Sequence, residues 1–122
     1  MLTDRSPALK TLNDNIQLNI ENTSSGSIIA KELSWGEDLD RYPQSFDIVL
    51  GADIIYIEET FEELLTTIRH LSHPHTIVLL SCRIRYERDL RFLAKLRQFF
   101  TVEEVLYEAK RDVYIYSAVR ND

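Results

Sequence analysis

The sequence is poor in residues that mark several whole classes of protein. Its 122 residues include one cysteine, Cys82, so no internal disulfide can form and a reducing compartment, the cytoplasm, is expected. Three glycines and three prolines are far fewer than collagen-like or disordered chains carry. Apolar runs such as residues 77–80 are too short to span a bilayer, and no signal peptide is recognisable at the start.

Basic residues are also scarce. Lysine and arginine total 14 against 20 aspartates and glutamates, which gives a net charge of -6 and argues against nucleic acid as a partner. The glycine-rich phosphate loops G-x-G-x-x-G and G-x-x-x-x-G-K-[ST] are absent from these 122 residues. What remains is the composition of a soluble, acidic, globular chain of one-domain length.

Hydrophobic spacing predicts that helices and strands alternate. Ser6 as N-cap and Pro7 as first helical residue begin a helix whose apolar face runs from Leu9 to Ile20. The other predicted elements are strands at 27–33, 46–50, 76–80, 101–107 and 112–119, helices at 58–71 and 86–100, and a loop at 34–45.

The pattern indicates an α/β sheet with helices on both faces. The run FDIVL at 46–50 is typical of a strand buried on both sides, and Leu90 is expected to face inward from the helix at 86–100. Four residues separate the last two strands, which favours an antiparallel hairpin. In such sheets the site lies beyond the carboxyl ends of the strands, here Thr3-Asp4, 51–53 and 81–83.

The segment Gly51-Ala52-Asp53-Ile54-Ile55-Tyr56 is the most informative of these ends. Small residues allow close approach of a ligand or another backbone, and we expect Asp53 at a cleft rim, partly desolvated, where its carboxylate could orient or accept a proton. Tyr56 would add an aromatic wall for a cationic group. The alternative, a helix-capping aspartate beside a packing tyrosine, has equal weight on chemistry alone.

Asp4 and Trp35 carry weaker signals. A carboxylate at the first strand end could hold ribose hydroxyls, although a solvated helix-start acid is the more ordinary interpretation. Trp35 could flank a flat ligand, although a lone tryptophan more often packs half-buried. An acidic run could steer a basic substrate, although a solvated helix face is the commoner reason for it; the run comprises Asp53, Glu58, Glu59, Glu62 and Glu63.

Two further clusters have little predicted chemistry. His70, His73 and His75 surround Pro74 without an adjacent cysteine or aspartate, so we expect a surface turn and no metal site. Arg83 and Arg85 could lower the pKa of Cys82, but no histidine base is recognisable beside it.

Four stretches together carry a family resemblance: LTDRSPALKTLNDNIQLN, KELSWG, FDIVLGADIIYIEETFEELL and IVLLSCRIRYERD. They resemble the seven-β-strand protein-lysine methyltransferases, in particular the methyltransferase-like twenty-one group (family 16) and its branch that methylates Hsp70-type chaperones. The most specific pieces are the D-x-x-Y motif from Asp53 to Tyr56 and the run CRIRYERD at 82–89.

The resemblance implies an S-adenosyl-L-methionine-dependent enzyme with a Rossmann-like sheet. Asp4 matches the family's ribose-binding acid, Trp35 its aromatic beside the adenine, and Ala52 its small residue in the cofactor pocket. Asp53 and Tyr56 match the pair placed where the substrate lysine meets the cofactor. The chemistry is methyl transfer to a neutral amine, which depends on proximity and electrostatics. The implied partner is a lysine-bearing protein such as an Hsp70-type chaperone, and the expected state is a monomer.

The family also has a strand and a glycine-rich loop before the position of Asp4, which residues 1–122 do not include. That strand would lie in mid-sheet, between the strands ending at Asp4 and Asp53, and its loss would leave backbone groups unpaired. The sequence is therefore interpreted as the carboxyl-terminal part, 1–122, of a single methyltransferase domain, and weak or no cofactor binding is expected.

Two alternatives stay open at this point. In a phosphoreceiver domain Asp53 would be the phospho-acceptor, Ser81 the switch hydroxyl and Lys110 the phosphate-binding lysine, but paired acids after a first strand are lacking. In the other alternative the chain belongs to the family but acts only as a non-catalytic interaction module.

Overall fold

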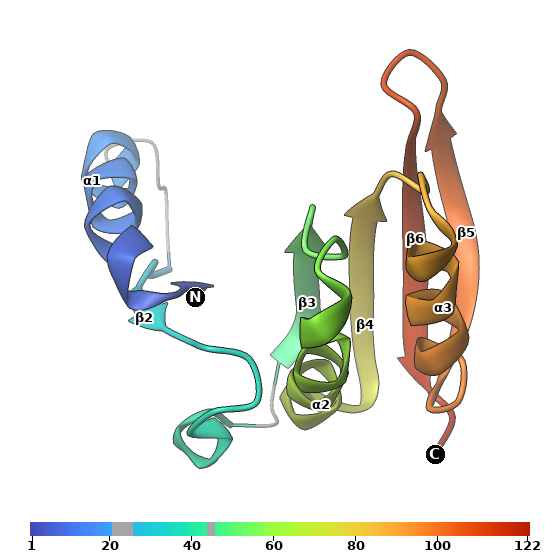
Figure 1. Cartoon of the computed structure of the whole chain (residues 1–122). Coiled ribbons are helices and arrows are strands. Elements are labelled where there is room, and N and C mark those ends of the chain that lie inside the picture. Colours follow the sequence, from blue (N-terminus) through green and yellow to red (C-terminus); the bar gives the residue numbers. More distant parts are fainter. Residues whose placement is uncertain (21–25, 44–45) are drawn as a thin grey trace. The chain divides into compact units, whose positions relative to one another are not determined.

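The computed structural model describes residues 1–20, 26–43 and 46–122. It divides the chain into two compact units, Met1–Asp38 and Leu39–Asp122, which are considered separately below. Figure 1 colours them from blue at the N-terminus to red at the C-terminus.

The first unit combines a two-stranded parallel sheet with one helix. Strand β1 (Leu2–Asp4) pairs with β2 (Ala30–Glu32), so that Asp4 lies opposite Glu32 at the carboxyl edge. A short 3₁₀ turn (Ser6–Ala8) leads into α1 (Leu9–Asn19). The predicted N-cap at Ser6 is wrong, because Arg5 holds the extended cap position and Ser6 lies inside the 3₁₀ turn. The predicted strand at 27–33 is shorter than expected.

The second unit is a four-stranded mixed sheet. Strands β3 (Phe46–Ala52), β4 (Ser72–Cys82), β5 (Phe100–Glu108) and β6 (Val113–Arg120) lie in the order β3-β4-β6-β5. β3 runs parallel to β4, whereas β6 is antiparallel to both β4 and β5. The predicted closing hairpin is therefore confirmed, and the carboxyl ends of β3 and β4 meet at one edge.

Helices α2 (Phe61–Leu71) and α3 (Glu87–Leu96) lie side by side on one face of this sheet (Figure 1). A 3₁₀ turn (Glu58–Thr60) precedes α2, with acids in its first turn where the helix dipole favours them. Phe61 and Phe92 meet edge to face at 5.2 Å between the helices. Both side chains are fully buried, which places the core of the unit between these helices and the strands beneath.

Three predictions about burial need correction. Strand β3 is not buried on both faces, since Ile48 and Leu50 are 57% and 73% exposed. The expectation of helices on both faces does not hold for the second unit, where α2 and α3 cover the same face. Leu90 points outward, because the face of α3 that packs on the sheet carries Asp89, Phe92, Leu93 and Leu96 and Leu90 lies outside that arc.

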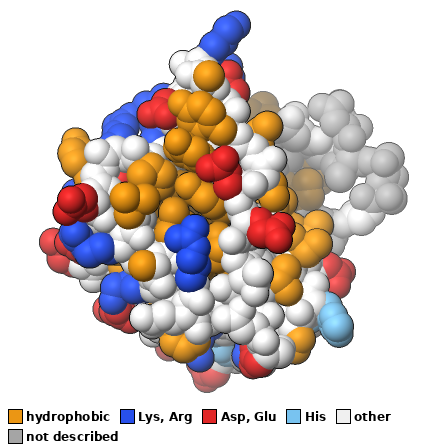
Figure 2. Space-filling view, turned by 90° about the vertical axis from the view of Figure 1, so that its right-hand side faces the viewer, with side chains coloured by type: hydrophobic (Ala, Val, Ile, Leu, Met, Phe, Trp, Pro, Cys, Tyr) orange, Lys and Arg blue, Asp and Glu red, His pale blue; other side chains and the backbone are white. Residues whose placement is uncertain are grey.

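Within the described ranges, several strands also have an edge that is not paired with another strand. Among the described residues β1 pairs only with β2, and β3 only with β4, so each has one edge without a strand partner. These are the two edges between which the family resemblance expects a further strand. At the opposite edge β5 exposes Val105, Leu106 and Tyr107, and Figure 2, which views that side, shows hydrophobic side chains interrupted by acidic ones.

In the described ranges no helix has both the length and the apolar character that crossing a membrane requires. The last two residues of the predicted loop at 34–45 lie outside the described residues; the rest includes a 3₁₀ turn at Leu39–Arg41.

Candidate functional site

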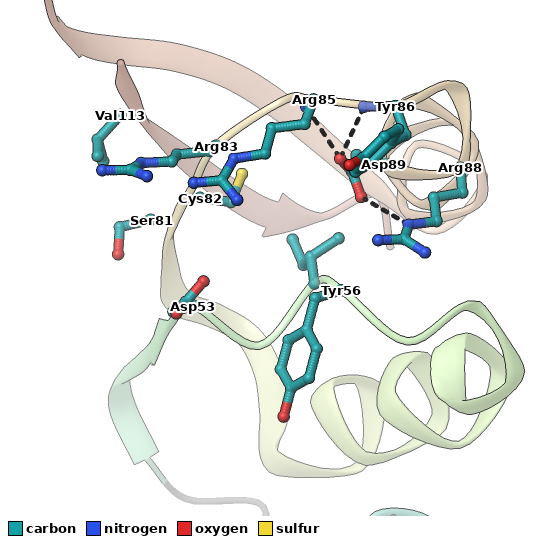
Figure 3. A pocket seen from close by; sticks show the side chains of 11 residues that line it. Asp53, Tyr56, Ser81, Cys82, Arg83, Arg85, Tyr86, Arg88, Asp89 and Val113 are labelled. Carbon is teal, nitrogen blue, oxygen red and sulfur yellow. Dashed lines mark hydrogen bonds and ion pairs between the residues drawn. The ribbon is translucent and has the colours of Figure 1, made fainter. Parts of the chain in front are cut away.

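A pocket of about 460 Å³ opens at the carboxyl ends of β3 and β4. Its size falls in the usual range for ligand pockets. Two segments shape it: the turn after β3 and the segment joining β4 to α3 (Figure 3). The lining residues are Asp53, Ile55, Tyr56, Ser81, Cys82, Arg83, Arg85, Tyr86, Arg88, Asp89 and Val113.

Asp53 directly follows β3 in a left-handed conformation with φ of 56°, which aspartate tolerates better than most residues. Its backbone N–H donates to the carbonyl of Ser81 at 3.0 Å, which extends the β3–β4 ladder by one residue. The side chain lines the pocket and is exposed, and the partial desolvation expected for its carboxylate stays a prediction. Asp53 is therefore accessible to a cationic group that enters the pocket from solvent.

Gly51 has a packing reason to be small. A Cβ at this position would lie 2.5 Å from Cδ1 of Ile54 and 2.8 Å from Cδ2 of Leu80. The groups that come close to Gly51 are thus side chains of the protein itself, and their packing holds the turn 53–56 against β4. Ala52, the residue that follows, is exposed and leaves the strand end uncrowded.

Tyr56 lines the same pocket as Asp53, with 51% of its surface exposed. Ile55 beside it is buried and fixes the turn, while Tyr56 stays at the surface. The structure thus brings Asp53 and Tyr56 to one pocket, next to Ala52.

On sequence grounds Arg83 and Arg85 were considered only for their effect on Cys82, and no binding role was predicted for the arginine-rich wall that they form in the pocket with Arg88. Arg83, Arg85 and Arg88 come from the segment after β4, across the open space from Asp53 and Tyr56 (Figure 3). Arg88 is engaged: its guanidinium lies 4.7 Å from the Tyr86 ring, and its Nε lies 3.8 Å from Oδ1 of Asp89. The run CRIRYERD was a signal for this wall, since it alternates arginines along a strand end.

Asp89 organises that wall from inside. Its Oδ2 accepts hydrogen bonds from the backbone N–H groups of Arg85 at 3.0 Å and Tyr86 at 3.1 Å, and the side chain is buried. Asp89 therefore satisfies amide groups at the start of α3 and fixes the backbone that carries Arg85.

Cys82 is not an activated thiol. Burial raises its pKa from 9.0 to about 11, with further contributions from Asp89 and Asp53. The expected lowering by Arg83 and Arg85 is wrong, because the nearby charges of largest effect are carboxylates from other elements.

Asp4 and Trp35 belong to the first unit. Asp4 lies at the carboxyl end of β1, where its Oδ1 accepts from the backbone N–H of Arg5 at 2.7 Å. Trp35 follows the parallel neighbour β2 and is half-buried. Asp4 and Trp35 therefore both lie at or just beyond the carboxyl ends of the two strands of this small sheet. The structure does not place them relative to the pocket of the second unit.

Two of the five residues of the acidic run have a cationic partner on α3. Glu58 pairs with Arg91 at 2.7 Å, and Glu62 pairs with Lys95, so two of its charges are neutralised by α3. The three histidines take part in hydrogen bonds: Nε2 of His70 lies 2.9 Å from the carbonyl of Tyr42, which is distant in sequence, and His73 Nδ1 accepts from the N–H of its near neighbour His75. Within the part of the chain that the structure describes, no group of three or more potential ligands could hold a metal ion.

Comparison with solved structures defines the class of fold. A precorrin-6y C5,15-methyltransferase from Geobacter metallireducens superimposes with a TM-score of 0.68, covering 98% of this chain and 65% of that one, at 16% identity. The pyocyanin biosynthetic protein PhzM gives 0.65 over 97% and 42%, at 18% identity. The fold is that of the Rossmann-like methyltransferases.

The sequence matches a lysine methyltransferase family over residues 1–99, and the chain belongs to that family. Protein N-lysine methyltransferase METTL21A is 55% identical in Danio rerio, over 98% of this chain and 56% of the relative, and 44% identical in Mus musculus, over 99% and 56%. EEF1A lysine methyltransferase 3 of Xenopus tropicalis is 35% identical, over 98% and 53%. The chain thus spans just over half the length of these curated relatives.

The phosphoreceiver alternative finds no support in these comparisons. Lys110 lies in the turn between β5 and β6, whereas Asp53 and Ser81 lie at the ends of β3 and β4.

Proposed function

We propose that this chain serves S-adenosyl-L-methionine-dependent methylation of a lysine in a protein, with Asp53 and Tyr56 on the lysine side. The observation that carries the proposal is the D-x-x-Y pair lining one pocket at a strand end, in a chain of the lysine methyltransferase family. An exposed carboxylate beside an aromatic ring suits a lysine head group, which the carboxylate orients and the ring flanks. The family's D-x-x-Y motif occurs in this chain without substitution.

The residues of the first unit fit the nucleoside part of the cofactor. Oδ2 of Asp4 accepts no hydrogen bond within the described ranges, so this exposed carboxylate can bind hydroxyl groups. The half-buried indole of Trp35 can flank a planar base, and Ala52 leaves room at its strand end. When bound, the cofactor would supply the electrophilic methyl group. Asp4, Trp35 and Ala52 would bind and orient the cofactor, while Asp53 and Tyr56 would hold the amine.

We further propose an Hsp70-type chaperone as the substrate and the cytoplasm as the place of action. The chaperone comes from the family resemblance of the sequence, and the identity to the METTL21A proteins, at 55% and 44%, is higher than that to the EEF1A methyltransferase of Xenopus tropicalis, at 35%. A lone reduced cysteine accords with a reducing compartment. The interpretation of residues 1–122 as the carboxyl-terminal part of one domain remains a prediction.

The lysine side is tested by fluorescence anisotropy with the 122-residue chain. A labelled peptide with a central lysine is compared with its twin carrying norleucine, and we expect the lysine peptide to bind about tenfold more tightly. Asp53→Asn should abolish that preference, because it removes the charge but keeps a residue that accepts positive φ. Asp38→Asn is the matched control, since Asp38 also has positive φ and lies outside the pocket lining. Equal binding of both peptides would contradict the proposal.

The cofactor side is tested by calorimetric titration. We expect no micromolar binding of S-adenosyl-L-methionine to the 122-residue chain, because the resemblance assigns the methionine part to a loop that residues 1–122 do not include. Micromolar affinity would show that prediction to be wrong. Methyl transfer from tritiated cofactor to Hsp70-type chaperone, and not to EEF1A, would decide between the substrates. Labelling of neither protein would favour the non-catalytic interaction module.

A further inference from the structure

We infer that Arg83 and Arg85 select substrates with acidic residues close to the target lysine, an inference that rests on the proposed function. The pocket lining contains three arginines against two aspartates, although the chain as a whole has a net charge of -6. A local excess of positive charge on an acidic molecule points to recognition of an anionic group at this place.

The arginines differ in how they are already used. Arg88 stacks near Tyr86 and faces Asp89, and outside the pocket Arg91 pairs with Glu58. The exposed side chains of Arg83 and Arg85 have no acidic partner within 4.0 Å among the described residues. Both therefore keep their guanidinium donors available for a carboxylate that comes with a ligand, in the bidentate geometry that arginine prefers.

The backbone beneath the arginines is held in place before any ligand arrives. Buried Asp89 fixes the N–H of Arg85, and Arg83 directly follows β4, whose last residue Cys82 pairs with Tyr114 of β6. Anchored arginines lose less conformational freedom on binding than arginines on a loose loop would.

Arg83 and Arg85 lie across the pocket from Asp53, which is proposed to hold the lysine. Figure 3 shows Asp53 on one side of the open space and Arg83 and Arg85 on the other, while the ring of Tyr56, which also lines the pocket, points away from the arginines. All of these residues line one pocket. A lysine held near Asp53 thus leaves the residues close to it in the sequence of the substrate near the arginines.

An acidic peptide accounts for these features better than a nucleic acid does. Two exposed guanidinium groups match one or two carboxylates, whereas a long polyanion would be repelled by the net negative charge of the chain.

The test uses the full 122-residue chain and labelled 13-residue peptides with a central lysine. One peptide carries glutamates two residues before and after the lysine, and its twin carries glutamines. We expect the acidic peptide to bind about tenfold more tightly at low salt. The double variant Arg83→Ala/Arg85→Ala should bring the two peptides within twofold of each other. Arg83→Lys/Arg85→Lys, which keeps the charge and loses the planar fork, should retain part of the preference.

The matched control is Lys110→Ala/Arg111→Ala, which removes two exposed positive charges from the β5–β6 turn, outside the pocket lining. This variant should keep the full preference for the acidic peptide, and circular dichroism should show all variants folded. An equal loss in both double variants would mean a general charge effect and would overturn the inference.

Other results overturn it in different ways. Equal binding of the two peptides to the unaltered chain, or no binding of either, contradicts it directly. So does tighter binding of a single-stranded oligonucleotide through the same arginines, or a preference for the acidic peptide that stays intact in Arg83→Ala/Arg85→Ala. Failure of the proposed function is detected separately, by the norleucine twin and Asp53→Asn, because those change the lysine side alone.

Discussion

The two faces of the four-stranded sheet in the second unit carry similar apolar side chains, but these are buried on one face and more exposed on the other. Along β4, Val78 and Leu80 point to the helix-covered face and are 0% and 1% exposed, whereas Ile77, directly before Val78, is 44% exposed. On the uncovered face, β3 places Leu50 opposite Leu79, and Leu50 is the more exposed of the two. Burial is therefore decided by whether α2 and α3 lie over a strand residue, and not by its hydrophobicity.

The covered face should respond most strongly to loss of a side chain at Phe92. This ring is fully buried and meets Phe61 edge to face, so Phe92→Ala leaves a cavity between α2 and α3. We expect it to lower the free energy of unfolding by about 3–5 kcal/mol, measured by urea denaturation. A loss below about 1 kcal/mol would mean that the two helices do not form the core that the structure shows.

A smaller loss is expected at the start of α3. Asp89→Ala leaves the N–H groups of Arg85 and Tyr86 without their acceptor, which should cost about 1–2 kcal/mol in the same denaturation experiment. Asp89→Asn keeps an acceptor oxygen and should lose less. If both variants lose equally, the hydrogen bonds of the carboxylate are not the cause.

The pH dependence of folding stability provides a further test of the covered face, at Cys82. Its thiol is neutral when protonated, and its pKa rises from 9.0 to about 11 on the covered face, so the folded chain holds this proton more tightly than the unfolded chain. The stability it contributes is present below pH 9 and is lost as pH rises through 11. Burial also raises the pKa of Tyr116, which adds to the same trend. Cys82→Ala should show a shallower loss of stability between pH 9 and 11, and an unchanged slope would contradict the role of the thiol.

The smallest effect is expected on the uncovered face. Leu50→Thr replaces a side chain that is 73% exposed with a residue suited to strands, and should change stability by less than about 0.5 kcal/mol. Leu80→Thr on the covered face is the matched comparison and should cost several times more, because it buries a hydroxyl and leaves a void. Similar losses from both substitutions would remove the distinction between the faces.

Sequence reasoning predicted those elements whose signal is local. Phe61, Leu64, Leu65 and Ile68 recur at helical spacing and form the buried face of α2, and a four-residue connection predicted the closing hairpin. It failed where burial depends on partners. The run FDIVL has the composition of a strand buried on both faces, yet only its neighbours in space could show that β3 lies at an edge.

For the candidate site, too, sequence reasoning succeeded where the signal is local and failed where it depends on neighbours in space. Asp53 and Tyr56 were predicted from a motif that is contiguous in sequence, and the pocket contains both. The chemistry of Cys82 was misjudged because Arg83 and Arg85 are its neighbours in sequence, whereas the carboxylates of Asp89 and Asp53 act on its thiol. The binding role of Arg83 and Arg85 was not predicted, because it depends on the absence of acidic partners near them among the described residues. Only the fold shows that absence.

The strand order β3-β4-β6-β5 also has a consequence for how the chain is made. β6 lies between β4 and β5 although it follows both in sequence. During synthesis on a ribosome, β5 would therefore emerge with no place in the growing sheet until β6 had followed it. Without β6 the apolar side chains of β5 have no strand to pair with, so a released chain that ends before Val113 should aggregate or be captured by chaperones where the full chain folds.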